Sequence, residues 1–208
     1  SSRGNDEGMI IINTGPNDWK KWSDLMKAIT QNFIDQFGTE EVRSWFFEVW
    51  NEPDGWPNDQ LEIFYKMYDV FVDAVKSIDS ELRVGGPACY HEYFLKSFLN
   101  HVTNGINYVT GKKGTQIDFI SYHIYGLSGK WLNKAPHIQP QVQRFTLSVL
   151  WLQRLLKLFP SLKGTAFHIN EWGLSSNYFR TVKDYPDLIY RNSISSPLFL
   201  FKLVNSLY

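Results

Sequence analysis

The sequence predicts an α/β fold in which helices cover both faces of a mainly parallel sheet. Short apolar segments alternate with longer segments of helical periodicity along the chain of 208 residues. The short segments are almost continuously apolar, as is typical of parallel strands that are buried on both faces. No internal repeat or low-complexity tract interrupts the alternation. We therefore expect one domain, residues 1–208, built around a single core.

Five strands are expected, because five short segments are rich in β-branched and aromatic residues. They span residues 10–12, 43–50, 82–84, 117–124 and 165–170. A closed (β/α)8 TIM barrel needs eight strands and about 250 residues, whereas five strands would suit an open doubly wound sheet. No glycine-rich phosphate loop follows the first strand, which disfavours the nucleotide-binding form of that sheet.

Helices are expected between the strands. Asn17 and Asp18 can cap the first helix, which runs to about residue 37 and stops at Gly38, since Asn and Asp favour helix starts and Gly favours helix ends. Pro197 should kink the last helix. The other segments of helical spacing cover residues 60–78, 92–102, 141–159 and 187–208.

Composition and charge exclude several classes of protein. The chain has 21 basic and 21 acidic residues, so it lacks the basic excess of a protein that binds nucleic acid through phosphates. No apolar run reaches the roughly 18 residues of a membrane span. We therefore expect neither a nucleic acid nor a membrane as a partner. Aromatic residues make up 16% of the chain, which permits a sugar-binding cleft.

No motif indicates a cofactor or a metal. His91 and Glu92 lack the second histidine of the zinc-protease helix. The segment 105–112 resembles a phosphate-binding loop, but its spacing is one residue too long and Lys113 stands where Ser or Thr is required. Cys89 is the single cysteine, and a buried thiol is its expected state. We therefore expect a protein without a cofactor and without a bound metal.

Two Asn-Glu pairs follow predicted strands and form the strongest functional signal. They are Asn51-Glu52, before Pro53, and Asn170-Glu171, before Trp172. Functional residues of α/β barrels project from the carboxyl ends of the strands. Glycoside hydrolysis needs two carboxylates, one to protonate the leaving oxygen and one to attack the anomeric carbon or to activate water. Glu52 and Glu171 are therefore the candidate catalytic residues.

A structural interpretation of these pairs is also open. A single Asn-Glu at a strand end is usually a turn or a helix start, because Asn caps helices and Glu favours the first helical turn. Two such pairs at matching strand ends, each beside a tryptophan, favour the catalytic interpretation over the structural one.

Further candidates could bind substrate. His123 and Tyr125 end the strand between the two Asn-Glu pairs, where they could bind sugar hydroxyls or tune a carboxylate, or could simply pack at the sheet edge. The side-chain amide of Asn51 could bind a hydroxyl or orient Glu52. Trp172 could stack on a sugar ring, as could Trp50 and Trp56, although packing in the core is the more common use of tryptophan.

Four segments, taken together, resemble glycoside hydrolase family 39 of clan A, which contains β-xylosidases and α-L-iduronidases. The similarity extends from about residue 18 to residue 208, and the motifs occur in the order of that family. Asn-Glu-Pro alone is shared across the clan, so the combination is what is specific. The segments read WFFEVWNEP at 45–53, LRVGGP at 82–87, IDFISYH at 117–123 and HINEW at 168–172.

The resemblance implies a retaining hydrolase that acts by double displacement. Glu52 matches the general acid/base of the family, Glu171 matches the nucleophile, and Asn51 matches the residue that binds the 2-hydroxyl group. The resemblance also implies a TIM barrel of which this chain carries strands three to seven with their helices. The missing segments would come from the rest of the gene product or from a homo-oligomer partner. A lysosomal or extracellular location is what the family suggests.

The substrate class stays open between two branches. Residues 104–111 resemble an insertion of the animal iduronidases, whereas those enzymes have a lysine where this chain has Tyr125, and a phenol cannot supply the fixed charge that pairs with a uronate. A neutral β-xyloside therefore fits at least as well as an α-L-iduronide. Two other classes stay open: a catalytically inactive carbohydrate-binding or structural derivative, and a flavodoxin-like nucleotide binder.

Overall fold

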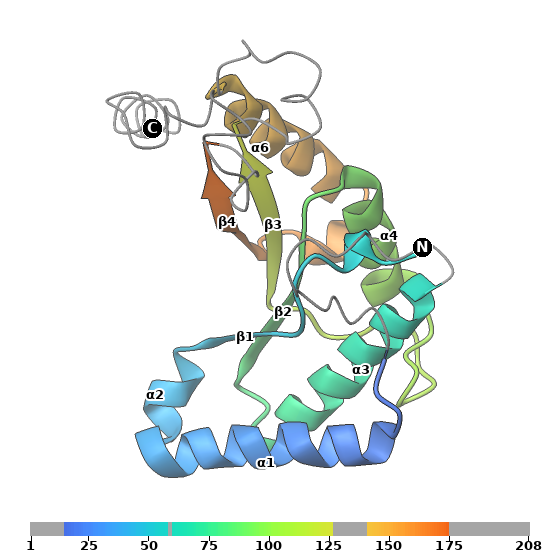
Figure 1. Cartoon of the computed structure of the whole chain (residues 1–208), viewed down its shortest axis with the longest axis vertical. Coiled ribbons are helices and arrows are strands. Elements are labelled where there is room, and N and C mark those ends of the chain that lie inside the picture. The colour runs from blue at the N-terminus through green and yellow to red at the C-terminus, as the bar shows by residue number, and fades with distance from the viewer. Residues whose placement is uncertain (1–14, 58–59, 127–140, 175–208) are drawn as a thin grey trace, which may run out of the picture. The chain divides into compact units, whose positions relative to one another are not determined.

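The structure, a computed structural model, describes residues 15–57, 60–126 and 141–174. The chain divides into two compact units, Ser1–Ile120 and Ser121–Tyr208. Figure 1 labels the elements of both units. The expected strand over 10–12 and the expected helix over 187–208 lie outside the described residues.

Helix α1 of the first unit spans Trp19–Phe37 and confirms the predicted caps. The carboxylate of Asp18 accepts a hydrogen bond of 3.0 Å from the backbone N–H of Lys21. Gly38 ends the helix with a φ of 84° and donates its N–H to the carbonyl of Ile34 at 2.8 Å. A short helix that the sequence did not suggest, α2 (Thr39–Arg43), follows at once.

Strand β1 is much shorter than predicted. It covers Phe46–Glu48 instead of 43–50, because Arg43 ends α2 and the backbone turns left-handed at Trp50, with a φ of 69°. β1 pairs in parallel with β2 (Arg83–Cys89), and Phe47 lies opposite Val84. The parallel pairing agrees with the fold class predicted from the apolar strands.

Strand β2 is longer than predicted, since it continues through Gly-Gly-Pro to Cys89. A Cβ atom at Gly85 would lie 2.2 Å from the carbonyl oxygen of Phe119, so the two backbones approach too closely for any residue but glycine. Asp118 fixes this approach, because its carboxylate accepts the N–H of Val84 at 2.9 Å and its own N–H donates to the carbonyl of Val84 at 2.7 Å.

The core of the first unit contains aromatic side chains of α3 (Leu61–Ile78) and α4 (Glu92–Asn104). The ring centroids of Phe64 and Phe98 are 5.8 Å apart, and those of Tyr68 and Phe98 are 4.9 Å apart. All three side chains are fully buried. Burial of such large apolar side chains is the main source of stability for a unit of this kind. Helix α1 packs against α3 (Figure 1).

The second unit contains most of β3 (Phe119–Tyr125), helix α6 (Gln143–Leu156), the short 3-10 helix η3 (Pro160–Leu162) and β4 (Ala166–Gly173). β3 and β4 are neighbouring strands that run in the same direction (Figure 1). The N–H of Gly126 donates to the carbonyl of Gly173 at 2.9 Å. β4 extends past the predicted end at residue 170, so Glu171 lies within the strand and not after it.

The described elements alternate between strands and helices along the chain, which confirms the α/β fold class. The assignment of these strands as the third to seventh of a barrel stays a prediction. Among the described helices, none combines the length and the apolar character that a bilayer crossing requires.

Candidate active site

Glu52 occupies a strained turn that follows β1. Its backbone is left-handed, with φ 48° and ψ 54°, a conformation that costs a residue with a Cβ atom roughly 1–2 kcal/mol. Its N–H donates to the carbonyl of Ala88 at 2.9 Å, and its carbonyl accepts the N–H of Gly55 at 3.0 Å. Ala88 is also left-handed, with a φ of 50°. Strained backbone of this kind persists where the surroundings fix it, commonly at functional sites.

Asp54 is a buried carboxylate in the same turn, on the short 3-10 helix η1 (Pro53–Gly55). Its Oδ2 atom accepts the backbone N–H groups of Tyr90 at 3.0 Å and of His91 at 2.7 Å, and it lies 3.0 Å from Nδ1 of His91. Burial raises the pKa of Asp54, and the N–H groups of Tyr90 and His91 oppose that rise. Asp54 is not among the candidates expected from the sequence, where its only signal is its position two residues after Glu52.

The two tryptophans of this turn differ in exposure. Trp56 is buried and its ring lies 6.2 Å from that of Phe64. Trp56 therefore packs in the core, which was the alternative to stacking on a sugar ring. Trp50 is 40% exposed and meets Trp56 edge-on at 5.4 Å. Asn51 is exposed between Trp50 and Glu52. Trp50 and Asn51 therefore face solvent, whereas Trp56 packs the turn against the core.

In the second unit, three of the predicted site residues meet. The hydroxyl of Tyr125 donates a hydrogen bond to Oε1 of Glu171, and Nδ1 of His123 lies 3.7 Å from Oε2. His123 and Tyr125 are buried on β3, whereas the side chain of Glu171 is 40% exposed. The carboxylate of Glu171 is thus backed by two buried polar groups and open to solvent, an arrangement that can present an oriented nucleophile.

Trp172, beside Glu171 on β4, is 46% exposed. The predicted role of Trp172 in stacking on a sugar ring stays a prediction. Cys89, in contrast, is buried at the end of β2, and burial raises the pKa of its thiol, as expected of an inert structural cysteine.

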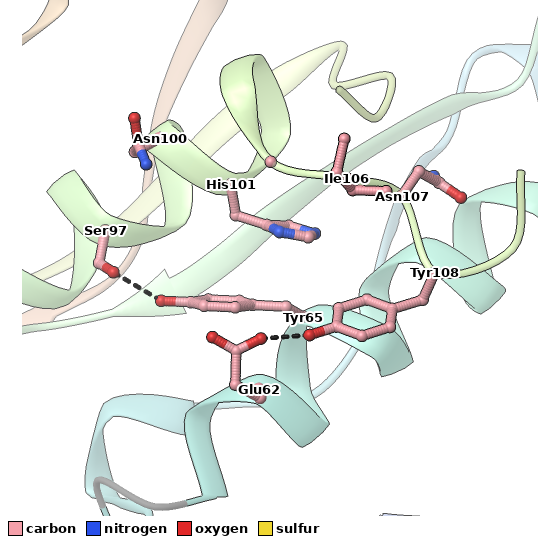
Figure 2. Close-up of a pocket in the computed structure, with 9 residues that line it drawn as sticks. Glu62, Tyr65, Ser97, Asn100, His101, Ile106, Asn107 and Tyr108 are labelled. Atoms are coloured by element: carbon pink, nitrogen blue, oxygen red, sulfur yellow. Dashed lines mark hydrogen bonds between the residues drawn. The ribbon is translucent and has the colours of Figure 1, made fainter. Parts of the chain in front are cut away.

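A cavity of about 380 Å³ lies elsewhere in the first unit, between α3, α4 and residues 105–108 (Figure 2). None of the predicted site residues lines it in the described part of the chain. His101 stacks on Tyr65 at 4.7 Å. The hydroxyl of Tyr108 donates to the carboxylate of Glu62, which raises the pKa of Tyr108 to about 12.

The groups around this cavity are largely engaged with one another. Tyr65 donates its hydroxyl to Ser97 at 2.8 Å. Buried Asp69 accepts the N–H of Tyr108 at 2.8 Å and lies 3.1 Å from Nε2 of His101. This network ties the loop after α4 to α3, and we assign it a structural role.

Comparison with known proteins identifies relatives among glycosidases. Residues 12–190 match the profile of the family described as "Glycosyl hydrolases family 39". A β-xylosidase of Geobacillus stearothermophilus is 38% identical over 129 residues, which are 60% of this chain and 23% of that protein. The α-L-iduronidase of Mus musculus is 27% identical over 203 residues, which are 85% of this chain and 30% of that protein.

Solved structures share the fold. The bacterial orthologue of human α-L-iduronidase aligns with a TM-score of 0.71 and 23% identity over 94% of this chain and 34% of its own. A monomeric β-xylosidase of Caulobacter crescentus CB15 aligns with a TM-score of 0.61 and 31% identity, over 80% of this chain and 33% of its own. The chain thus spans about a quarter to a third of the proteins it matches. Since the profile covers most of the sequence, as the motifs predicted, the chain belongs to glycosyl hydrolases family 39.

Proposed function

We propose that the protein containing this chain hydrolyses O-glycosidic bonds with retention of anomeric configuration. The observation that carries the proposal is the contact between Tyr125 and Glu171, in which a buried hydroxyl orients a half-exposed carboxylate. Membership of a family whose relatives are β-xylosidases and α-L-iduronidases supports it. Carbohydrate is then the expected substrate.

Glu171 is the proposed nucleophile. Its carboxylate attacks the anomeric carbon, the glycosidic C–O bond breaks, and a glycosyl ester of Glu171 forms. Tyr125, at Oε1, and His123, 3.7 Å from Oε2, hold the carboxylate in one orientation, so that little reorientation precedes the attack. Water then breaks the ester, and the carboxylate of Glu171 is regenerated.

Glu52 is the proposed general acid and base. It gives its proton to the leaving oxygen in the first step and removes a proton from the attacking water in the second. A retaining mechanism requires carboxyl groups about 5–5.5 Å apart. The strained turn at Glu52 supports this role, because such backbone commonly marks a functional position.

Asn51, His123, Tyr125 and Trp172 are the proposed substrate contacts. Asn51 would bind the 2-hydroxyl group, and Trp172 would stack on the sugar ring. Position 125 holds a tyrosine, which supplies no fixed positive charge for a uronate carboxylate, so a neutral β-xyloside fits at least as well as an α-L-iduronide. We also propose that residues 1–208 form part of one barrel domain, with strands three to seven, which the rest of the gene product completes.

The test uses the full-length protein with aryl β-xylosides and aryl α-L-iduronides. Turnover should fall to background in Glu171→Ala and should stay within about twofold of wild type in Glu40→Ala, a control whose side chain is 91% exposed. Azide should rescue Glu52→Ala on activated substrates and give a glycosyl azide of retained configuration. Normal turnover in both Glu52→Ala and Glu171→Ala contradicts the proposal. Glycan binding without any turnover favours an inactive carbohydrate-binding protein.

A further inference from the structure

We infer that Asp54 is a positioning residue, which holds the turn of Glu52 against the end of β2 and so aims the acid/base at the leaving oxygen. The inference rests on the proposed function of Glu52. It concerns a residue that does not itself touch substrate. Asp54 contacts Tyr90 and His91, which lie 36 and 37 residues further along the chain.

The contacts of Asp54 converge on a single atom. Oδ2 accepts N–H groups from two successive residues, Tyr90 and His91, at 3.0 and 2.7 Å, and lies 3.0 Å from the ring atom Nδ1 of His91. These donors follow directly on β2 and precede α4, for which His91 is the N-cap. Asp54 therefore fixes the turn to a place where two regular elements meet.

The segment that Asp54 contacts is itself well anchored. The carbonyl of His91 accepts the N–H groups of Phe94 and Leu95, both at 3.1 Å, at the start of α4. The ring of His91 lies 4.0 Å from that of Tyr90 and 5.0 Å from that of Tyr93. A turn held by this segment cannot shift without disturbing the first turn of a helix of 13 residues.

The backbone near Glu52 is strained, and the contacts of Asp54 help to hold it in that conformation. Trp50, Glu52 and Ala88 all have positive φ values, of 69°, 48° and 50°, and none is a glycine. The bond from the N–H of Glu52 to the carbonyl of Ala88 joins two of these strained residues. Asp54 adds a second link between the same two segments, because it lies two residues after Glu52 and contacts Tyr90, two residues after Ala88. Two links fix an orientation that one link would leave free to rotate.

The burial of Asp54 fits a functional purpose better than a purely structural one. Its side chain is 0% exposed, and among the described residues Oδ1 has no hydrogen-bond partner. A buried carboxylate with an unsatisfied oxygen destabilises a fold. Buried groups that lower the stability of the fold are expected where the exact position of a residue is required for function.

The test compares Asp54→Ala and Asp54→Asn in the full-length protein with a matched control, Asp69→Asn. Asp69 is equally buried, with 0% side-chain exposure, and also accepts hydrogen bonds, but it belongs to the network of His101 and Tyr108. The readout is kcat/KM for a series of aryl glycosides whose phenols range from strongly to weakly acidic. Strongly acidic phenols leave without protonation, so only weakly acidic ones depend on the acid.

Asp54→Ala should lower kcat/KM for the phenyl glycoside at least about tenfold more than for the dinitrophenyl glycoside, which is part of the 10²–10⁴-fold effect of a general acid. Azide should raise kcat of this variant on the dinitrophenyl glycoside, as we expect for Glu52→Ala. Asp54→Asn retains an acceptor oxygen for the three contacts and should restore the wild-type profile. Asp69→Asn should change kcat/KM, relative to wild type, by the same factor for every glycoside in the series. An equal loss across the series in Asp54→Ala, or no loss, overturns the inference.

Two further variants keep the result decisive. If Asp54→Ala does not fold, His91→Ala replaces it, because that change removes the ring contact of Asp54 from a side chain that is 30% exposed. It should slow the phenyl glycoside several-fold more than the dinitrophenyl glycoside, and a uniform effect or none overturns the inference. Glu52→Ala is measured in the same series. If Glu52→Ala itself shows no dependence on the leaving group, the proposed function fails, and not merely the role of Asp54.

Discussion

The hydroxyl of Tyr125 on β3 donates a hydrogen bond to the carboxylate of Glu171 on β4. Both residues were candidates from the sequence, but 45 residues separate them along the chain and no local pattern predicts their contact. Neighbouring strands bring them together. A phenol in this place orients the carboxylate without adding a charge beside it, which suits the nucleophilic role that we propose for Glu171.

The first prediction concerns this hydrogen bond. Tyr125→Phe removes the hydroxyl but keeps the ring, which is buried, so the fold should be retained. A hydrogen bond to a charged group contributes about 1.5–3 kcal/mol. We therefore expect kcat/KM on an aryl glycoside to fall roughly 10- to 100-fold. Tyr93→Phe, at a side chain that is 58% exposed, should change nothing, and equal activities of the two variants would remove Tyr125 from the site.

The second prediction concerns the aromatic core. Phe98 is fully buried between α3 and α4, and its replacement by alanine should lower the free energy of unfolding by about 3–5 kcal/mol. Tyr93→Ala, an exposed change on the same helix, should cost within about 0.5 kcal/mol. Urea unfolding followed by circular dichroism measures both. A loss below about 1 kcal/mol in Phe98→Ala would show that this cluster does not form the core.

The third prediction concerns the close approach of β2 to the start of β3. A Cβ atom at Gly85 would meet the carbonyl oxygen of Phe119 at 2.2 Å, and the backbone would have to move. Gly85→Ala should therefore destabilise the protein by at least about 1–3 kcal/mol, as overpacking does. Gly55→Ala is the control, since a Cβ atom there meets nothing within 4 Å. Equal thermal midpoints of the two variants would contradict the strand arrangement.

The fourth prediction concerns the dependence of stability on pH. The hydrogen bond from Arg43, at 2.7 Å, lowers the pKa of Asp79 from 3.8, and the N–H of Glu81 adds to that effect. A carboxylate with a lowered pKa in the folded state stabilises the fold above its unfolded pKa, and this contribution is lost as the pH falls through the folded value. Asp79→Asn should therefore be less stable than wild type at pH 7.

The same variant supplies the check at acid pH. The difference in unfolding midpoint between wild type and Asp79→Asn should shrink as the pH falls below about 4, where the free carboxyl group becomes protonated. Urea unfolding at several pH values measures this difference. A difference that stays constant down to the lowest pH at which the protein folds would show that Arg43 and Asp79 are not coupled.

Capping signals predicted both ends of α1, whereas the helix expected over 141–159 is shorter, at Gln143–Leu156, and the strand ends were predicted poorly. Asp18 and Gly38 bound α1 as expected, because caps act within a few residues of sequence. The aromatic segment 43–50 favours a strand by propensity, but helix α2 occupies its beginning and left-handed backbone at Trp50 ends it early. β2 continues through Gly85, where the small residue serves a tertiary contact and not a turn.

Some residues of the candidate site could be predicted from the sequence and others could not. Glu52, Glu171, His123 and Tyr125 carry chemistry that the sequence displays, because residue type and position at a strand end were enough to select them. Asp54 carries no such signal, since its role depends on burial and on donors that lie about 36 residues further along the chain. Residues that act through their surroundings become visible only when those surroundings are known.

Covalent trapping tests the central claim most directly. A 2-deoxy-2-fluoro aryl glycoside of the preferred sugar should inactivate the full-length protein, since the fluorine slows hydrolysis of the glycosyl ester more than it slows loss of an activated phenol. Peptide mass spectrometry should then find the fluorosugar on Glu171. A protein that turns over ordinary aryl glycosides but carries the label on another residue, or that releases product of inverted configuration, would contradict the account.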